Sequence, residues 1–420
     1  MAMRRYLEHF EDMQVVEEPV KDDSFITKKL RENPTTPFLF EDFNGFRVAG
    51  NVWATRKRIA RALDQTPEDL LLKMLEAMKN PADFDVIEDA PVLKNVVEDV
   101  NLTESPITKW YPKDGGRYVT SDVVVAELGE KRNMSFHRMM VLDETRLAAR
   151  VVPRHLYAMW KEAIERGEEL KIAVAIGLCP SILLPAGMSV SYETDELRIA
   201  AALRLATLGE NIGATRIKSG LTVPGYAEYV LEGRMIDETE KEGPFVDITG
   251  TYDIVRDEPV VVIDRIYHMD DPIFHALLPG GREHYLFMGM PREPQIYDSV
   301  KKVVPKVGGV RLTEGGCCWL HGVVSIEKQV EGDQKNAMMA AFTGHPSMKR
   351  IVVVDTDIDI YDDRDVEWAL ATRFQADRGM LKVKGARGSS LDPSAGGTTT
   401  KLGMDATKPL GGEGFDKAAP

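Results

Sequence analysis

The sequence predicts a multidomain protein of mixed α+β and α/β class, with a strand-rich central domain between two α/β domains. Its 420 residues suffice for two or three domains. Near residue 105 the pattern changes from helices and short strands to a succession of strands, and near residue 290 it changes back. We therefore expect domains at 1–104, 105–288 and 289–385, followed by a C-terminal arm at 386–420.

The composition limits the possible partners and location. The net charge of −14 argues against binding to nucleic acid or to an anionic membrane, because both select basic surfaces. No apolar stretch reaches the length of a membrane span, and the N-terminal residues lack the apolar centre of a signal peptide. The three cysteines include the adjacent pair Cys317-Cys318, which fits no disulfide framework. We therefore expect a protein of the reducing cytoplasm.

The first predicted domain contains two short strands followed by two helices. Pro37–Phe40 and Phe46–Asn51 have the composition of strands. Arg56–Leu63 and Pro67–Met78 carry apolar residues at helical spacing, and Pro81 follows the second of them closely. Together these segments form a small α/β unit.

The central domain is predicted to be a barrel-like β domain with helical insertions. Its most apolar segment, Ile172–Ile176, is typical of a buried strand. One helix is expected from Pro153 to Gly167, and another from Glu196 to Leu208, with Asp195 as its N-cap and Gly209 at its end. Further strands are expected at 118–126, 134–141, 146–152, 227–231, 247–252 and 260–266.

The third predicted domain again combines helices and strands. Helices are expected at 296–304 and 365–372, and strands at 319–326 and 351–354. The residues after Ala386 are rich in Gly, Ser, Thr, Pro and Lys, a composition that cannot form a core alone. We therefore expect an arm that is either mobile or lies on another surface.

Several common catalytic and binding motifs are absent from the sequence. There is no Walker A motif, no G-x-G-x-x-G and no G-x-S-x-G nucleophile elbow. The acidic run that begins at Asp355 resembles a calcium loop, but its sixth position is Ile360 and its twelfth is Val366. The usual nucleotide-binding and hydrolase chemistries are therefore disfavoured.

Two carboxylates flank a Gly-Pro pair in the segment 241–250. Pro244 fixes its own φ and disfavours a helical Gly243, so Glu242 and Asp247 are expected on a bent, extended segment. Two acids held in this way could share a site in which one of them stays protonated. Alternatively, the segment is a solvated turn between strands, the commoner situation for acidic residues.

A second set of polar residues is scattered along the central domain. Asn133 and Arg138 lie on one predicted strand, and Arg154 and His155 lie in the first turn of a helix, where free N–H groups favour an anion such as phosphate. Glu196 opens the next helix. Asn, His and Glu together with a phosphate oxygen would suit Mn²⁺ or Mg²⁺. Alternatively, these are satisfied half-buried polar groups and a favourable helix-dipole interaction, and their spacing does not show that they meet.

Taken together and in order, these motifs resemble the UbiD family of decarboxylases along most of the chain. The segments that carry the resemblance are Asn133-x-Ser135-x-x-Arg138, Val152-Pro153-Arg154-His155, Leu183–Met188 leading to Glu196, Val223–Gly233, Glu242-Gly243-Pro244-Phe245, Asp357–Tyr361, Leu391-Asp392-Pro393 and Asp405-Ala406-Thr407.

The resemblance implies a fold, a cofactor and an assembly. The central domain would be a split β-barrel of flavin reductase type that binds prenylated FMN, and the C-terminal domain would support a homo-oligomer, either a dimer or a hexamer. A flavin prenyltransferase would supply the cofactor. By position, Asn133, His155 and Glu196 would bind Mn²⁺ or Mg²⁺, with a K⁺ site nearby. The cofactor-binding residues implied by the resemblance are Asn133, Ser135, Phe136, Arg138, Arg154, His155 and Met188.

The resemblance also implies the chemistry and the catalytic residues. The family reversibly decarboxylates α,β-unsaturated or aromatic acids; loss of CO₂ leaves an sp² carbanion, so the cofactor must act as an electron sink. Arg138 would bind the substrate carboxylate, Glu242 would hold Arg138, and Asp247 would protonate the carbon that loses CO₂. The sequence departs from better-known members at Asp247, where they have Glu, and at Thr343, where ferulic acid decarboxylase has Lys.

Details of these motifs resemble an archaeal subgroup that converts trans-anhydromevalonate 5-phosphate to isopentenyl phosphate in isoprenoid biosynthesis. Asp247, Ser135–Arg138 and Pro153–Tyr157 carry this resemblance. A phosphorylated substrate needs further cations. The alternatives are a decarboxylase of an aromatic acid such as hydroxybenzoate, and a flavin-binding protein without catalysis. The candidates for phosphate contacts are Arg216, Lys218, Arg282 and Arg292.

Overall fold

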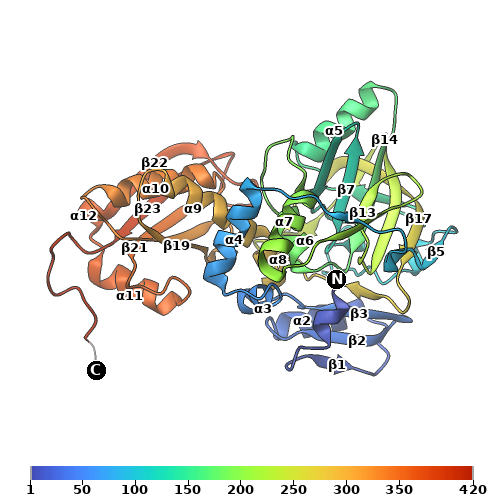
Figure 1. Cartoon of the computed structure of the whole chain (residues 1–420), viewed down its shortest axis with the longest axis horizontal. Coiled ribbons are helices and arrows are strands. Elements are labelled where there is room, and N and C mark those ends of the chain that lie inside the picture. Colours follow the sequence, from blue (N-terminus) through green and yellow to red (C-terminus); the bar gives the residue numbers. More distant parts are fainter. Residues whose placement is uncertain (1, 419–420) are drawn as a thin grey trace. The chain divides into compact units, whose positions relative to one another are not determined.

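The computed structural model describes residues 2–418, which divide into two compact units, one ending at Phe287 and the other beginning at Met288 (Figure 1). The first unit contains the strand-rich region and the segments before it, and the second unit is a separate α/β fold. Among the described residues, no helix combines the length and the apolar composition needed to cross a membrane.

A nine-stranded sheet dominates the first unit. The long strands β14 and β17 pair antiparallel at its centre, and β11 and β7 continue the sheet on the other side of β14. The strand order is β6-β9-β10-β17-β14-β11-β7-β8, and β5 also pairs with β17. The strands are β5 (Asn95–Val97), β6 (Tyr118–Val119), β7 (Val123–Leu128), β8 (Lys131–Ser135), β9 (Met139–Val141), β10 (Arg146–Ala149), β11 (Leu170–Ile176), β14 (Tyr229–Glu242) and β17 (Arg256–His268).

This sheet is barrel-like but not closed. Within residues 2–418, no ladder joins β6 to β8, the two ends of the strand order. The inner strands are apolar because they are buried: in β11, every residue except Lys171 is buried. The prediction of a strand-rich central domain, open in the manner of a split barrel, is confirmed.

Helices cover this sheet, and two of them begin at polar residues that the sequence singles out, His155 and Glu196. The α7 helix (Glu196–Leu208) begins as predicted, because the Asp195 side chain accepts a hydrogen bond from the N–H of Leu197 at 2.9 Å. It ends as predicted at Gly209, which has a left-handed φ of 66°. The other helices of this region are α5 (His155–Glu165), α6 (Pro180–Ala186) and α8 (Arg282–Gly289), which reaches the boundary between the units.

Smaller sheets flank the nine-stranded one. A four-stranded sheet has the order β1-β2-β3-β18, and its last strand comes from far along the chain. Its strands are β1 (Gln14–Val16), β2 (Phe38–Phe43), β3 (Phe46–Gly50) and β18 (Ile273–His275). Two further sheets contain β13 (Thr222–Pro224), β12 (Gly213–Arg216) and β4 (Asp85–Val86), and β15 (Phe245–Val246) with β16 (Tyr252–Asp253). The N-terminal helices are α1 (Arg4–Leu7), α2 (Asp23–Glu32), α3 (Arg56–Arg61) and α4 (Pro67–Lys79).

The second unit is a five-stranded sheet with helices. Its strand order is β19-β20-β21-β23-β22, with β23 parallel to β21 and antiparallel to β22. Part of the segment predicted as an arm thus lies inside a sheet, and Ala406 of β23 is fully buried. The elements are α9 (Glu293–Lys301), β19 (Val307–Leu312), β20 (His321–Ile326), α10 (Asp333–Gly344), β21 (Arg350–Asp355), α11 (Asp363–Arg373), α12 (Ala376–Gly379), β22 (Met380–Arg387) and β23 (Thr398–Ala406).

Three local predictions are wrong. The strand predicted at 118–126 is two strands, β6 and β7, which pair with different partners. The other two errors lie near the polar residues of interest. The strand predicted at 134–141 is two strands, because β8 ends at Ser135 on β7 and β9 begins at Met139 on a different partner. The strand predicted at 247–252 is a turn between β15 and β16. Gly250, with a φ of 72°, donates to the carbonyl of Asp247 at 2.8 Å and closes this turn.

Candidate functional site

Arg138 lies between three carboxylates. Its Nε and one Nη donate to the two oxygens of Glu242 at 2.9 and 3.0 Å. The same Nη donates to Asp253 at 3.0 Å, and the other Nη donates to Asp247 at 2.5 Å. The side chain of Arg138 is 9% exposed and that of Glu242 is fully buried. The structure thus brings together the three residues to which the sequence analysis assigned catalysis.

The chain segments around Arg138 explain why these acids converge. Glu242 is the last residue of β14, and a cis peptide joins Gly243 to Pro244 immediately after it. The chain then forms β15, turns through residues 247–251 and returns as β16. This ribbon places Asp247 at the start of the turn and Asp253 in the returning strand. Both acids therefore face the same guanidinium.

The electrostatics of the cluster keep Arg138 and Asp253 charged. Burial alone would lower the pKa of Arg138, but hydrogen bonds and charge from Glu242, with the charges of Asp247 and Asp253, raise it. Burial alone would raise the pKa of Asp253, but hydrogen bonds from Arg256 and the charge of Arg138 hold it below its ordinary value. The guanidinium also lies over the ring of Phe245, 4.6 Å from its centroid.

Two buried residues, Tyr118 and Asp114, form hydrogen bonds with the segment 242–246, which leads to Asp247. The hydroxyl of Tyr118 donates to Glu242 at 3.1 Å and accepts from the N–H of Gly243 at 3.1 Å. Asp114 accepts from the N–H of Val246, the residue before Asp247, at 3.3 Å. Burial raises the pKa of Asp114 to about 6.

A half-buried histidine of α8, His284, interacts with the same cluster. The Nδ1 of His284 accepts from the N–H of Gly280 at 3.1 Å, which leaves its hydrogen on Nε2. Burial lowers the pKa of His284, an effect that nearby Asp247 opposes and Arg138 reinforces. His284 is therefore neutral at pH 7 and interacts electrostatically with both residues.

A second polar cluster contains the three predicted metal ligands. Asn133 in β8 donates from Nδ2 to Glu196 at 3.1 Å, and the N–H of Met134 donates to the other oxygen of Glu196 at 2.9 Å. The Nδ1 of His155 lies 3.9 Å from Glu196. Burial raises the pKa of Glu196, an effect that the contact with His155 opposes. The three residues that spacing alone did not connect lie together.

This cluster has the donor chemistry of a divalent metal site. Within residues 2–418 no lysine or arginine forms an ion pair with Glu196, although its side chain is only 3% exposed. A buried carboxylate without a cation is costly, and a bound metal ion would remove that cost. One carboxylate oxygen, one imidazole nitrogen and one amide oxygen suit Mn²⁺ or Mg²⁺. The residues present therefore fit a metal ion.

The other predicted cofactor-binding residues lie around this cluster or are placed separately. Ser135 donates to the amide oxygen of Asn133 at 2.8 Å. Phe136 stacks on Phe287, with ring centroids 6.2 Å apart. Arg154 is the residue before α5 and donates to the Ser189 hydroxyl at 3.0 Å. The α5 helix begins at His155, two residues later than predicted. Met188 is buried just after α6, and Thr343 lies in α10 of the second unit.

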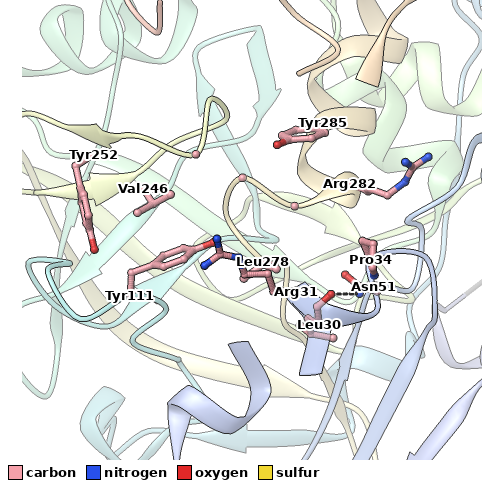
Figure 2. Close-up of a pocket in the computed structure, with 13 residues that line it drawn as sticks. Leu30, Arg31, Pro34, Asn51, Tyr111, Val246, Tyr252, Leu278, Arg282 and Tyr285 are labelled. Atoms are coloured by element: carbon pink, nitrogen blue, oxygen red, sulfur yellow. Dashed lines mark hydrogen bonds between the residues drawn. The ribbon is translucent and has the colours of Figure 1, made fainter. Parts of the chain in front are cut away.

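A pocket of about 520 Å³ adjoins the acid-bearing turn (Figure 2). Val246 and Gly250, on either side of Asp247, form part of its wall. Figure 2 shows Arg31 beside the phenol of Tyr111, and the charge of Arg31 lowers the pKa of Tyr111 against the larger, raising effect of burial. None of the lining residues is acidic. They are Leu30, Arg31, Pro34, Asn51, Tyr111, Val246, Gly250, Tyr252, Leu278, Gly280, Gly281, Arg282 and Tyr285.

The structure separates the four candidate phosphate contacts. Arg282 lines the pocket, and its Nε donates to the carbonyl of Ala54 at 3.4 Å. Lys218 is exposed and lies 3.6 Å from Glu98. Arg216 is exposed on β12. Arg292 lies in the second unit over the ring of Trp319.

Sequence reasoning missed Asp253, Tyr118, His284, Asp114 and Arg31. Four of them have no local signal, since the acid-bearing segment or the pocket residue that each adjoins lies far away in the chain. Asp253 is different. It follows Asp247 by six residues across a Thr-Gly-Thr turn, and Arg256 follows three residues later. Recognising this turn as the tip of a ribbon would have placed both acids at one site.

Family models match three successive parts of the chain. The N-terminal, Rift-related and C-terminal domains of 3-octaprenyl-4-hydroxybenzoate carboxy-lyase match residues 4–78, 85–282 and 285–406. The chain belongs to the UbiD family. The division predicted at 1–104, 105–288, 289–385 and 386–420 stays a prediction.

UbiD relatives match over nearly the full length. The anhydromevalonate phosphate decarboxylase of Methanothermobacter thermautotrophicus is 44% identical over 97% of both chains. The protein of the same name from Archaeoglobus fulgidus is 46% identical over 96% of this chain and 92% of its own. The UbiD-class enzyme HmfF from Pelotomaculum thermopropionicum, solved with FMN, is 34% identical with a TM-score of 0.96, covering 100% of this chain and 97% of HmfF. An evolved dimeric HmfF, solved with prFMN, is 32% identical with a TM-score of 0.91, covering 99% and 97%.

Proposed function

We propose that this UbiD-type carboxy-lyase decarboxylates trans-anhydromevalonate 5-phosphate to isopentenyl phosphate and CO₂. The observation that carries the proposal is Arg138, a buried guanidinium held by Glu242 beside a second acid, Asp247. Such an arrangement can bind an acid and deliver a proton beside it. The archaeal relatives, 44% and 46% identical over nearly the whole chain, support this substrate over an aromatic acid.

Each of the three residues has its own task in the proposed reaction. Glu242 fixes the plane and charge of Arg138 through two hydrogen bonds and is itself fixed by Tyr118. Arg138 binds and orients the substrate carboxylate. Asp247 donates the proton that replaces CO₂ on carbon, and it can do so because it lies at the start of a turn and is 15% exposed. Because the cluster is buried, water is excluded from the negative charge that develops as CO₂ leaves.

The residues of the second cluster fit a flavin phosphate with its metal ion. The start of α5 supplies free N–H groups and Arg154 supplies a positive charge, while Asn133, His155 and Glu196 offer metal ligands. When bound, prenylated FMN would supply the electron sink for the carbanion. Ser135, Phe136 and Met188 would contact the flavin, Asn133, His155 and Glu196 would hold Mn²⁺ or Mg²⁺, and K⁺ would bind nearby.

Removing the carboxylate of the metal site is expected to abolish metal retention. In Glu196→Gln, the protein should retain at least about tenfold less Mn²⁺, because a neutral amide replaces the only charged ligand. Metal content after gel filtration, measured by atomic emission, tests this. Glu193→Gln changes an exposed residue three positions earlier and should leave the metal content unchanged. Equal metal content in both variants would contradict the assignment.

We place the substrate phosphate in the pocket beside the acid-bearing turn. The pocket is lined by two arginines and no carboxylate, in a chain with 67 acidic and 53 basic residues. Arg31→Gln is expected to raise KM for the phosphorylated acid about 10- to 100-fold, with kcat little changed, because it removes hydrogen bonds to a charged group. Steady-state kinetics measure this. Lys218→Gln, which removes an equal charge outside the pocket, is the matched control.

Turnover by protein produced together with a flavin prenyltransferase tests the proposed function. CO₂ release from trans-anhydromevalonate 5-phosphate is expected, with none from 4-hydroxybenzoate. Release from the aromatic acid alone would assign the chain to aromatic decarboxylation. Flavin absorbance without turnover of either acid would leave only a flavin-binding protein. We further propose that the chain acts in the cytoplasm, since its cysteine content suits a reducing compartment. We also propose that it forms a homo-oligomer.

A further inference from the structure

The guanidinium of Arg138 has little capacity left for a substrate. An arginine offers five N–H groups. Four of them are directed at the carboxylates of Glu242, Asp247 and Asp253. One N–H remains on the Nη that contacts Asp247. A carboxylate that pairs bidentately needs two neighbouring N–H groups, so the substrate must displace one of the three acids.

The three acids differ in how firmly they are held. Glu242 is fully buried, and it accepts two hydrogen bonds from Arg138 and one from Tyr118. Asp253 takes two from Arg256, at 2.7 and 2.8 Å, and one from the N–H of Ile254. Asp247 takes one from Arg138 and one from its neighbour Ile248, and at 15% it is the most exposed of the three. Asp247 is therefore the acid that leaves.

We propose that the substrate carboxylate takes the place of Asp247 on Arg138, and that Asp253, braced by Arg256, is the positioning residue that keeps Arg138 still during this exchange. The proposal rests on the proposed function and deepens it. Glu242 and Asp253 hold opposite edges of the same Nη, so the guanidinium keeps its plane when Asp247 departs.

The exchange gives Asp247 the proton that the reaction needs. Decarboxylation of a carboxylate consumes one proton, since the C–CO₂ bond breaks and a C–H bond forms. Once displaced, Asp247 has lost its cation and faces an incoming carboxylate, and both changes favour uptake of a proton from solvent. Binding of the acid thus loads the proton donor. Before binding, Asp247 occupies an Nη of Arg138 and protects the guanidinium from other anions.

The charged groups around Asp247 come from every neighbouring segment. Arg138 precedes β9, Glu242 ends β14, Asp253 belongs to β16, and Arg256 lies behind Asp253 at the start of β17. Two other groups can accept a proton: His284 of α8, which is neutral, and Asp114, whose pKa burial raises to about 6 and which accepts from the N–H of Val246. Replacing His284 and Asp114 in separate variants therefore distinguishes these acceptors from Asp247.

Calorimetry of acid binding tests the exchange. Full-length protein produced without a flavin prenyltransferase is titrated at pH 7 with trans-anhydromevalonate 5-phosphate, in two buffers of different ionisation enthalpy. Wild-type protein is expected to take up about one proton per bound acid, because one carboxyl changes state. Asp247→Asn should lose this uptake while still binding, and His284→Gln and Asp114→Asn should each keep it. Binding without uptake, or equal uptake by Asp247→Asn, overturns the proposal.

Kinetics of the loaded enzyme test the role of Asp253. Asp253→Asn is expected to raise KM about 10- to 100-fold, with a smaller effect on kcat, because it removes a charged hydrogen bond from Arg138. Asp253→Glu should recover part of the loss. Asp257→Asn, which removes an exposed acid paired with Lys241, is the control. A kcat loss equal to that of Asp247→Asn, or a change equal to that of the control, excludes a positioning role.

A second acid separates failure of the exchange from failure of the proposed substrate. If 4-hydroxybenzoate binds with the same proton uptake and the phosphorylated acid does not bind, the exchange stands and the substrate is wrong. If the phosphorylated acid binds without uptake, the substrate stands and the exchange is wrong. If neither acid binds, both are wrong.

Discussion

Asp247→Asn is expected to reduce kcat about 10²- to 10⁴-fold, the usual contribution of a positioned general acid. The amide keeps the size of the side chain and can still accept a hydrogen bond from Arg138, but it has no acidic proton to give. Flavin binding should persist, since the metal and phosphate cluster lies on other residues. CO₂ release and the flavin absorbance spectrum, measured on the same sample, test both statements.

Two comparisons make this result specific. Asp257→Asn changes another acid of the same hairpin, which pairs with Lys241 at the surface, and should leave kcat unchanged. Asp247→Glu keeps an acid and should retain more activity than the amide. Near wild-type turnover by Asp247→Asn would remove the proton donor from the proposed mechanism.

Arg138→Gln is expected to lower the free energy of unfolding by about 3–5 kcal/mol and to abolish turnover. The loss arises because Glu242 is fully buried and would be left without its cation. Urea unfolding followed by circular dichroism measures the stability, and CO₂ release measures turnover. The expected instability is larger than that of any other single change considered.

The double variant Arg138→Gln with Glu242→Gln separates the two effects. It removes the buried charge together with its partner, so much of the stability should return while turnover stays absent. Arg138→Lys keeps the positive charge but cannot form the two-pronged contact with Glu242, so it should be more stable than Arg138→Gln and still poorly active. Unchanged stability in Arg138→Gln would contradict the inferred burial of the cluster.

The sequence predicts the elements of the fold whose signals are local. The run Ile172–Ile176 forms β11, and Asp195 and Gly209 begin and end α7. The break between Ser135 and Met139 could not be predicted, because both halves have strand-like composition and only their different partners separate them. The turn at 247–251 contains a glycine in an otherwise strand-like segment, and this glycine was the missed signal.

β23 had no usable signal in the sequence. Its residues, Thr398–Ala406, include only two large apolar side chains, and they lie in a segment rich in Gly, Ser, Thr, Pro and Lys, a composition typical of a mobile segment. Within the sheet, however, one small residue of this strand is needed for packing against a helix. A side chain at Gly403 would collide with Met338 of α10, since an added Cβ would lie 2.6 Å from its sulfur atom. The small residue therefore allows the strand to approach the helix, a requirement that only the fold reveals.

At the site, the sequence named the principal acids but not their surroundings. The pairing of Arg138 with Glu242 was predicted from the family resemblance, and the structure places both Glu242 and Asp247 in contact with Arg138. The groups that support them, such as Tyr118 and Asp114, come from a segment more than a hundred residues earlier. Contacts over such separations follow from the strand order and not from any local pattern.

The position of β23 inside its sheet has a consequence for the order in which the chain folds on the ribosome. The strand lies between β21 and β22, so the sheet of the second unit is incomplete until Thr398–Ala406 has been synthesised. Until then the buried strand β21 exposes an unpaired edge, which can pair with the same edge of another nascent chain. The first unit contains both polar clusters and can fold during that interval, whereas the second unit must wait until β23 has been synthesised.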